Sequence, residues 1–259
     1  MSLAEDLHER ILAWRDQTAG LFVLGICGAQ GSGKSTLVAD LAQRLAAAGL
    51  RVATLSLDDL YLAKAARQAL AGKVHPLFAT RGVPGTHVVA LGLATIDALA
   101  RGEPAALPRF DKGRDDRAPE RDWPRAPADT QVLLLEGWCL GAAPQPAADL
   151  ALPVNALEAD EDPDGTWRGH ANTALARDYP ALWARIDRLI FLAAPDWEVV
   201  AAWREQQEAE LRQRAPAAMS PAEVTRFIQH YERLTRWMLA ELPDRADLTL
   251  RLDRARRVI

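Results

Sequence analysis

The segment 28–35 carries the residues whose chemistry is easiest to interpret in this sequence. It reads Gly-Ala-Gln-Gly-Ser-Gly-Lys-Ser and fits the phosphate-loop pattern G-x-x-x-x-G-K-[ST] at every fixed position. In such a loop the glycine backbone wraps around phosphates, the lysine reaches the β- and γ-phosphates, and the following hydroxyl is a ligand for Mg²⁺. We therefore predict Lys34 as a catalytic residue and Ser35 as a metal ligand. The predicted phosphate-binding residues are Gly28, Ala29, Gln30, Gly31, Ser32, Gly33, Lys34, Ser35 and Thr36.

Three acidic residues follow or end apolar runs and could complete a phosphoryl-transfer site. Asp58 and Asp59 come after one run, and Glu136 comes after four consecutive apolar residues. A carboxylate at a strand end beside a phosphate loop can accept a proton from an attacking hydroxyl, or hold Mg²⁺. We predict Asp58 as the catalytic base and a metal ligand, Glu136 as a second metal ligand, and Asp59 as a substrate contact. The alternative is that the two aspartates cap the next helix.

Basic residues gather in the segments that follow these strands. Arg81 and His87 belong to a glycine-containing loop, and Arg109 and Lys112 lie in the segment 107–112. Clustered cations beyond the strand ends would suit an anionic acceptor such as a carboxylate, although a lone basic loop residue is more often solvated. We predict these four residues as substrate contacts.

A third group of basic residues lies on or just after a charged helix. Arg204, Arg212 and Arg214 could close over the transferred phosphoryl group, and such a lid would also exclude water. Glutamates are interleaved with them, so a solvated helix with i,i+4 ion pairs explains the same residues. We predict residues 196–214 as a lid and Arg204 as its catalytic residue.

Short apolar segments alternate with helical patterns and determine where these residues lie. Alternation of this kind gives a parallel sheet with helices on both faces, in which ligands bind beyond the carboxyl ends of the strands. Strands are predicted over residues 21–27, 51–57, 131–137, 188–193 and 247–252. Helices are predicted over residues 3–18, 36–45, 87–100 (capped by Thr86), 171–185, 196–213 and 221–241.

The predicted fold is α/β, a three-layer sandwich of the P-loop NTPase type with a mostly parallel sheet of about five strands and a helical lid. One kinase-like domain is predicted to span residues 1–259, with its N-terminal helix within 1–18. The irregular segments 101–130 and 141–170 are predicted to be insertions on the substrate side.

Composition narrows the class of protein further. With 259 residues, 49% of them apolar and a net charge of −4, the chain suits a soluble globular protein without a nucleic-acid partner. No apolar stretch approaches the roughly 20 residues needed to span a bilayer. Cys27 and Cys139 have no nearby histidine with which to hold zinc, and they suit the core of a protein in a reducing compartment. We expect a cytoplasmic protein with no membrane partner, and the oligomeric state stays open.

Four segments resemble D-glycerate 3-kinase and its relatives, within the group that contains uridine kinase, phosphoribulokinase and bacterial pantothenate kinase. They are residues 56–62, 81–87, 107–112 and 135–141. The resemblance implies that Asp58 is the base, Glu136 organises magnesium and Arg204 belongs to the lid, and it adds Tyr61 as a substrate contact. Val88 stands where these relatives usually have an acidic residue, and the segment 113–117 is shorter than in the plant enzymes.

The leading hypothesis is a small-molecule kinase that uses ATP and Mg²⁺ and phosphorylates a small anionic acceptor. D-glycerate is the best candidate, with pantothenate, a nucleoside or another sugar acid as alternatives. A module that binds ATP without an acceptor belongs to a different class. A guanine-specific switch would need an Asn-Lys-x-Asp motif, and neither Asn155 nor Asn172 begins one.

Overall fold

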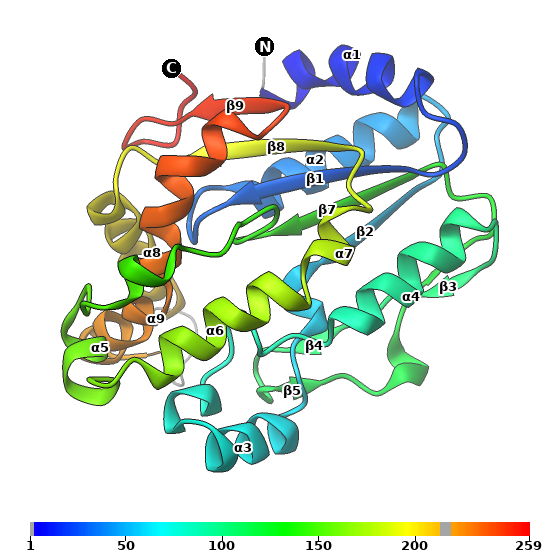
Figure 1. Cartoon of the computed structure of the whole chain (residues 1–259). Coiled ribbons are helices and arrows are strands. Elements are labelled where there is room, and N and C mark those ends of the chain that lie inside the picture. The colour runs from blue at the N-terminus through cyan, green and yellow to red at the C-terminus, as the bar shows by residue number, and fades with distance from the viewer. Residues whose placement is uncertain (1–2, 213–218) are drawn as a thin grey trace.

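The computed structural model describes residues 3–212 and 219–259, and its centre is a five-stranded sheet (Figure 1). The strand order is β2-β7-β1-β8-β9, and every neighbouring pair is parallel. This confirms the predicted fold class. The strands are β1 (Phe22–Gly28), β2 (Val52–Ser56), β7 (Val132–Gly137), β8 (Arg188–Ala193) and β9 (Leu248–Arg251).

The burial of each strand follows from its sequence. All seven residues of β1 are buried, because β1 lies between β7 and β8 and helices cover both faces of the sheet. The edge strand β2 instead alternates between buried and half-buried residues. Cys27 and Cys139 are both free and buried, and burial is the main cause that raises the pKa of the Cys27 thiol to about 12. These cysteines therefore belong to the core.

Helices pack on both sides of the sheet, with α2 behind it and α7 in front of it in Figure 1. The pair α8 and α9 packs together beside the carboxyl ends of the strands. In the two described ranges, no helix combines the length and the apolar character that crossing a membrane requires. The helices are α1 (Leu3–Asp16), α2 (Lys34–Ala47), α3 (Lys64–Lys73), α4 (Val89–Ala100), α5 (Ala156–Glu161), α6 (Thr166–Arg177), α7 (Pro180–Trp183), α8 (Trp197–Arg212) and α9 (Pro221–Glu241).

The segment 141–185 differs from its prediction as a loop followed by one helix. Asn155 caps α5 by accepting a hydrogen bond from the Glu158 backbone N–H, and Gly165, in the left-handed conformation, precedes α6. Pro180 then begins the separate helix α7, since proline lacks the N–H that a continuous helix would need there. The segment therefore contains three helices, α5, α6 and α7.

Thr86 does not cap α4, contrary to the prediction. The cap position is Val88, which makes no side-chain hydrogen bond there. The Thr86 hydroxyl instead accepts a hydrogen bond from the Gly82 N–H and donates one to the Val83 carbonyl. It thus closes the loop 82–86 on itself.

The segment 101–130 is largely irregular, as predicted, with two short antiparallel ribbons. One pairs β3 (Ala105–Ala106) with β6 (Arg125–Ala126), and the other pairs β4 (Phe110–Asp111) with β5 (Asp116–Arg117). We call residues 110–117 the β4–β5 hairpin.

Candidate active site

The phosphate loop connects β1 to α2 and needs glycine for two separate reasons. Gly31 and Gly33 have φ angles of 78° and 87°, in the region that favours glycine. A Cβ on Gly31 would also lie 2.5 Å from the Cβ of Trp203 on α8. Because Gly33 is the cap residue of α2, the backbone N–H groups at the start of this helix can bind an anion.

Glu136 lies at the carboxyl end of β7, in register with Ile26 of β1 and Ser56 of β2. Its Oε2 atom is 3.9 Å from the Lys34 Nζ and has no hydrogen-bond partner, although it is buried. The strand register therefore brings an acidic group to the phosphate loop, as the sequence predicted.

Asp58, Tyr61, Arg81, Lys112 and Arg204 meet the phosphate loop in one cavity of about 190 Å³, which we call the phosphate-loop cavity. These five residues come from four segments that lie far apart in the sequence, with Asp58 and Tyr61 in the same one. The complete lining is Gln30, Gly31, Lys34, Ser35, Asp58, Tyr61, Arg81, Lys112, Trp138, Arg204, Gln207, Phe227 and Tyr231.

Asp58 sits in the short 3₁₀ turn Leu57–Leu60 that follows β2. One carboxylate oxygen accepts a hydrogen bond from the Tyr61 hydroxyl at 2.8 Å, and the other is 2.7 Å from the Lys112 Nζ. Burial acts to raise the pKa of Asp58, but the charges of Lys112 and Lys34 and these hydrogen bonds outweigh burial and lower the pKa to about 2. Asp58 is therefore ionised at neutral pH.

Two arginines of the cavity lie over aromatic rings and are paired with carboxylates. Arg81 forms an ion pair with Asp115, and its guanidinium lies 5.5 Å from the centre of the Phe110 ring. Arg204 pairs with Glu208 one turn along α8, as the alternative reading of this helix expected. Since Arg204 also lines the cavity, the ion pair and a site role are compatible.

Arg212, another arginine of the predicted lid, lies outside the cavity. Arg212 pairs with Glu205 at 2.6 Å and donates to the Met219 carbonyl, and it is not among the residues that line the phosphate-loop cavity. Arg214 falls outside the described residues.

Asp59 and Arg109, both predicted as substrate contacts, fasten the β4–β5 hairpin to the end of β2. Asp59 accepts a hydrogen bond from the Phe110 N–H at 3.0 Å and pairs with the Arg109 Nη1 at 3.4 Å. Arg109 also donates to the Pro108 carbonyl at 2.7 Å. Neither side chain lines the cavity.

His87, a third predicted substrate contact, lies behind Tyr61. Its ring stacks on that of Tyr61 with 4.7 Å between centroids, and its Nδ1 is 2.6 Å from the Tyr179 hydroxyl. Burial lowers the pKa of His87 to about 4, so the imidazole is neutral at neutral pH. The structure therefore places His87 where it supports Tyr61 and does not face the cavity.

Two residues near the site carry no sequence signal that would have identified them. Arg67 on α3 is fully buried, and its Nη2 lies 2.5 Å from Asp115, the partner of Arg81. Tyr231 on α9 lines the cavity and donates its hydroxyl hydrogen to the Arg81 carbonyl at 3.1 Å. Both contacts join segments whose proximity depends on the folded chain.

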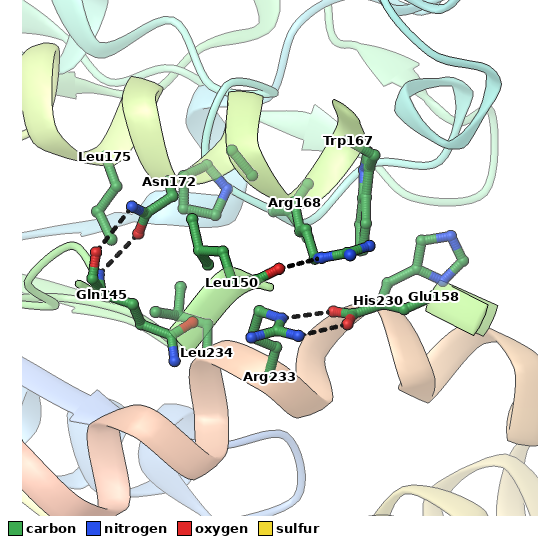
Figure 2. Close-up of a pocket in the computed structure, with 13 residues that line it drawn as sticks. Gln145, Leu150, Glu158, Trp167, Arg168, Asn172, Leu175, His230, Arg233 and Leu234 are labelled. Atoms are coloured by element: carbon green, nitrogen blue, oxygen red, sulfur yellow. Dashed lines mark hydrogen bonds and ion pairs between the residues drawn. The ribbon is translucent and has the colours of Figure 1, made fainter. Parts of the chain in front are cut away.

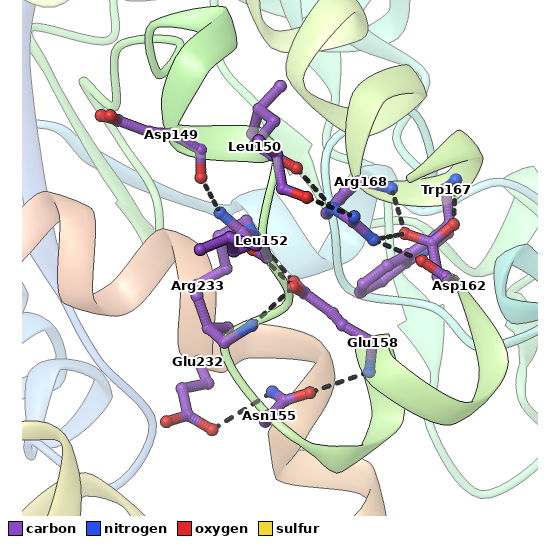
Figure 3. Close-up of polar contacts among 12 residues, drawn as sticks. Asp149, Leu150, Leu152, Asn155, Glu158, Asp162, Trp167, Arg168, Glu232 and Arg233 are labelled. Atoms are coloured by element: carbon purple, nitrogen blue, oxygen red, sulfur yellow. Dashed lines mark hydrogen bonds and ion pairs between the residues drawn. The ribbon is translucent and has the colours of Figure 1, made fainter. Parts of the chain in front are cut away.

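A second, smaller cavity lies between α6 and α9, and Figure 2 shows its polar contacts. Arg233 on α9 forms a buried double contact with Glu158 on α5, at 2.7 and 2.6 Å. Arg168 on α6 pairs with Asp162 at 2.9 Å (Figure 3). The first pair holds α5 against α9, the helix that carries Tyr231, and the second joins α6 to the residue that follows α5.

Comparisons with known proteins agree with this geometry. The family model "Methylmalonyl Co-A mutase-associated GTPase MeaB" matches residues 2–61, which include the phosphate loop. The "Uncharacterized kinase mug58" of Schizosaccharomyces pombe is 36% identical over 221 residues, covering 81% of this chain and 78% of that protein. The chloroplastic D-glycerate 3-kinase of Arabidopsis thaliana is 34% identical over 220 residues, covering 81% of this chain and 46% of that protein.

Among solved structures, a D-glycerate 3-kinase from Cryptococcus neoformans var. grubii has the same fold. Its TM-score is 0.82 at 24% sequence identity, with 100% of this chain and 98% of that chain covered.

The sheet and the phosphate loop define the fold of a P-loop protein, and the relatives in sequence are kinases. The chain belongs to the family of kinases that contains the S. pombe and A. thaliana proteins.

Proposed function

We propose that this kinase transfers the γ-phosphoryl group of ATP to a hydroxyl of a small hydroxy acid, with D-glycerate as the best candidate. The observation that carries the proposal is the position of Asp58, whose carboxylate shares one cavity with Lys34 and Ser35. A protein that only bound the nucleotide would need no base facing the phosphates. The resemblance to proteins named D-glycerate 3-kinase supports the choice of acceptor.

In the proposed mechanism Asp58 receives the proton of the attacking hydroxyl. A carboxylate with a pKa of about 2 is a weak base. Phosphoryl transfer tolerates this, because catalysis of this reaction rests mainly on positioning and on stabilisation of the charge on the transferred group. Tyr61 and Lys112 hold the carboxylate in place, and Lys34 and Arg204 stabilise the phosphoryl group.

The cations of the cavity support an anionic acceptor. Arg81 and Lys112 both line it, and Arg81 is paired with Asp115, which an incoming carboxylate could replace. Arginine and lysine bind carboxylates through charge-assisted hydrogen bonds. We therefore assign the acceptor carboxylate to this side of the cavity, within hydrogen-bond reach of these two residues.

The residues also fit a magnesium ion. Ser35, Asp58 and Glu136 offer oxygen atoms, the donors that Mg²⁺ prefers, and the buried Glu136 Oε2 lacks a hydrogen-bond partner. Among the described residues no group of three or more His, Cys, Asp or Glu could hold a metal alone. This agrees with Mg²⁺ bound by one or two carboxylates together with phosphates and water. The ion would neutralise phosphate charge.

An ATP-consumption screen over D-glycerate, other hydroxy acids, pantothenate, nucleosides and pentose phosphates tests the acceptor. We expect the largest stimulation with D-glycerate. Stimulation by D-glycerate of less than about twofold over background would overturn the acceptor assignment.

The Asp58→Asn variant tests the role of the base. We expect kcat to fall roughly 10²-fold or more while ATP affinity is retained. A variant as active as the wild type would contradict the assignment.

A further inference from the structure

Two arginines share one carboxylate beside the phosphate-loop cavity, and we call Arg67, Asp115 and Arg81 the Arg–Asp–Arg cluster. One oxygen of the Asp115 carboxylate pairs with Arg81, which lines the cavity, and the other lies 2.5 Å from the Arg67 Nη2 on α3. The guanidiniums of Arg81 and Arg67 both lie over the Phe110 ring, 5.5 and 5.6 Å from its centre. The β4–β5 hairpin thus supplies the counter-charge for both cations.

The Arg–Asp–Arg cluster carries one positive charge in excess. Arg67 is fully buried, and its other two nitrogens donate to backbone carbonyls at 2.6 and 3.3 Å, which bring no charge. The next two residues of the hairpin, Asp116 and Arg117, have opposite charges and leave the balance unchanged. Buried charge is costly unless an opposite charge compensates it. The cluster therefore suits one further anion, which would meet Arg81, the member that lines the cavity.

Arg81 differs in this respect from the other cations that line the cavity. Each of those has a carboxylate of its own nearby: Lys112 has Asp58, Arg204 has Glu208, and Lys34 has Glu136. Arg81 instead shares its carboxylate with a second, buried arginine. An anion that enters the cavity therefore finds its uncompensated positive charge at Arg81, and that charge amounts to one unit.

We propose that Asp115 determines the charge of the acceptor: it leaves the cluster a single excess positive charge, so the site favours acceptors with one carboxylate over acceptors with two. This inference rests on the proposed function, because it concerns the acceptor of that reaction. Asp115 acts through Arg81 and does not itself line the cavity. Its effect is electrostatic, and it takes no part in making or breaking bonds.

Asparagine is the replacement that removes the charge of Asp115 with the least other change. Asp115 has a φ angle of 54°, in the left-handed region, which asparagine tolerates better than most residues other than glycine. The amide keeps an oxygen atom that can accept a hydrogen bond. Arg67 also keeps the Asp115 backbone carbonyl as a partner, at 3.0 Å from its Nη2.

The size of the expected effect follows from the charge of the ligand. The Asp115 side chain is partly exposed, so solvent screens its field. Removing its charge should then raise the affinity for an anion by roughly fivefold for each negative charge that the anion carries. A ligand with two carboxylates should therefore gain about fivefold more than a ligand with one.

Isothermal titration calorimetry with D-glycerate and with tartronate tests this preference. The two anions have the same carbon skeleton, and tartronate carries a second carboxylate in place of the terminal hydroxymethyl group of glycerate. ADP is present to fill the phosphate loop, and Mg²⁺ is left out because tartronate chelates it. We expect the wild type to bind D-glycerate at least as tightly as tartronate. The Asp115→Asn variant should shift the ratio of the two dissociation constants about fivefold toward tartronate.

Asp116→Asn is the matched control, because it removes a neighbouring carboxylate of the same hairpin. The Asp116 carboxylate accepts hydrogen bonds from the N–H groups of Lys64 and Arg117 at 2.9 and 2.8 Å, and an amide oxygen can still accept them. The ratio of the two dissociation constants should stay within about twofold of the wild-type ratio.

A wild type that binds neither anion, or that binds tartronate more than about tenfold more tightly than D-glycerate, would overturn the proposal. This comparison needs no variant, so it decides the matter even if Asp115→Asn fails to fold. With a folded variant, a shift of less than about twofold, or an equal shift in Asp116→Asn, would also overturn it. If the anions bind as expected and ATP does not phosphorylate D-glycerate, the charge preference is supported while the proposed kinase reaction fails.

Discussion

Replacing Glu158 by glutamine should lower the free energy of unfolding by about 3 kcal/mol or more, because it leaves a buried arginine without its counter-charge. The Glu158 side chain is fully buried, and that of Arg233 is 9% exposed. Two hydrogen bonds of 2.7 and 2.6 Å join them, and Glu158 also accepts one from the Val154 N–H. An amide keeps one acceptor atom but removes the charge and turns a donor toward these groups.

Thermal unfolding followed by circular dichroism measures the effect. For a chain of this size each kcal/mol shifts Tm by about 2–4 °C, so we expect Glu158→Gln to lower Tm by roughly 10 °C. The control is Glu161→Gln, which removes the solvent-exposed pair with Arg226 between the same two helices. That variant should lose less than about 1 kcal/mol, since exposed ion pairs contribute little.

A double variant distinguishes the loss of the ion pair from the cost of leaving one buried charge without a partner. Glu158→Leu combined with Arg233→Met should be more stable than Glu158→Gln alone, because it removes both charges together. Two results would show that the buried pair does not stabilise the fold in this way: a loss below about 1 kcal/mol for Glu158→Gln, or equal losses for Glu158→Gln and Glu161→Gln.

Three further changes probe the site. Gly31→Ala should abolish measurable ATP binding in calorimetry, because its Cβ would meet Trp203 and φ is 78°; wild-type affinity would contradict the geometry. Tyr61→Phe should lower kcat about tenfold through loss of its hydrogen bond to Asp58, with the KM for ATP within about twofold, and an unchanged kcat would exclude this role. The folded-state pKa of His87, about 4, lies below its ordinary 6.5, so the folded protein binds fewer protons and loses stability as pH falls from about 6.5 toward 4. In His87→Phe the free energy of unfolding, measured by urea denaturation at several pH values, should fall less steeply between these pH values. A decline as steep as that of the wild type would contradict this prediction.

The parts of the site that could be predicted from sequence are those fixed by the position of a residue directly after a strand. The phosphate loop follows its strand directly, and Asp58 and Glu136 come at or just after strand ends. Because parallel strands bring their carboxyl ends to one edge, placing the strands was enough to bring these groups together.

The remaining contacts join residues that are far apart in the chain, so no short sequence pattern predicts them. Arg67 and Asp115 are 48 positions apart, and their pairing requires α3 to pack against the β4–β5 hairpin. His87 was predicted to contact substrate because it is a basic loop residue, but the short bridge between Tyr61 and His87 turns it toward the core. A sequence pattern identifies a polar residue in a loop without showing which side of the loop it faces.

Phosphorus-31 NMR of a reaction containing the protein, ATP, Mg²⁺ and D-glycerate distinguishes phosphoryl transfer to D-glycerate from hydrolysis of ATP. We expect a new phosphomonoester signal that grows in step with ADP and is absent without D-glycerate. The Asp58→Asn variant should form this signal roughly 10²-fold more slowly. ATP cleavage that yields inorganic phosphate alone, with or without D-glycerate, would contradict transfer to this acceptor.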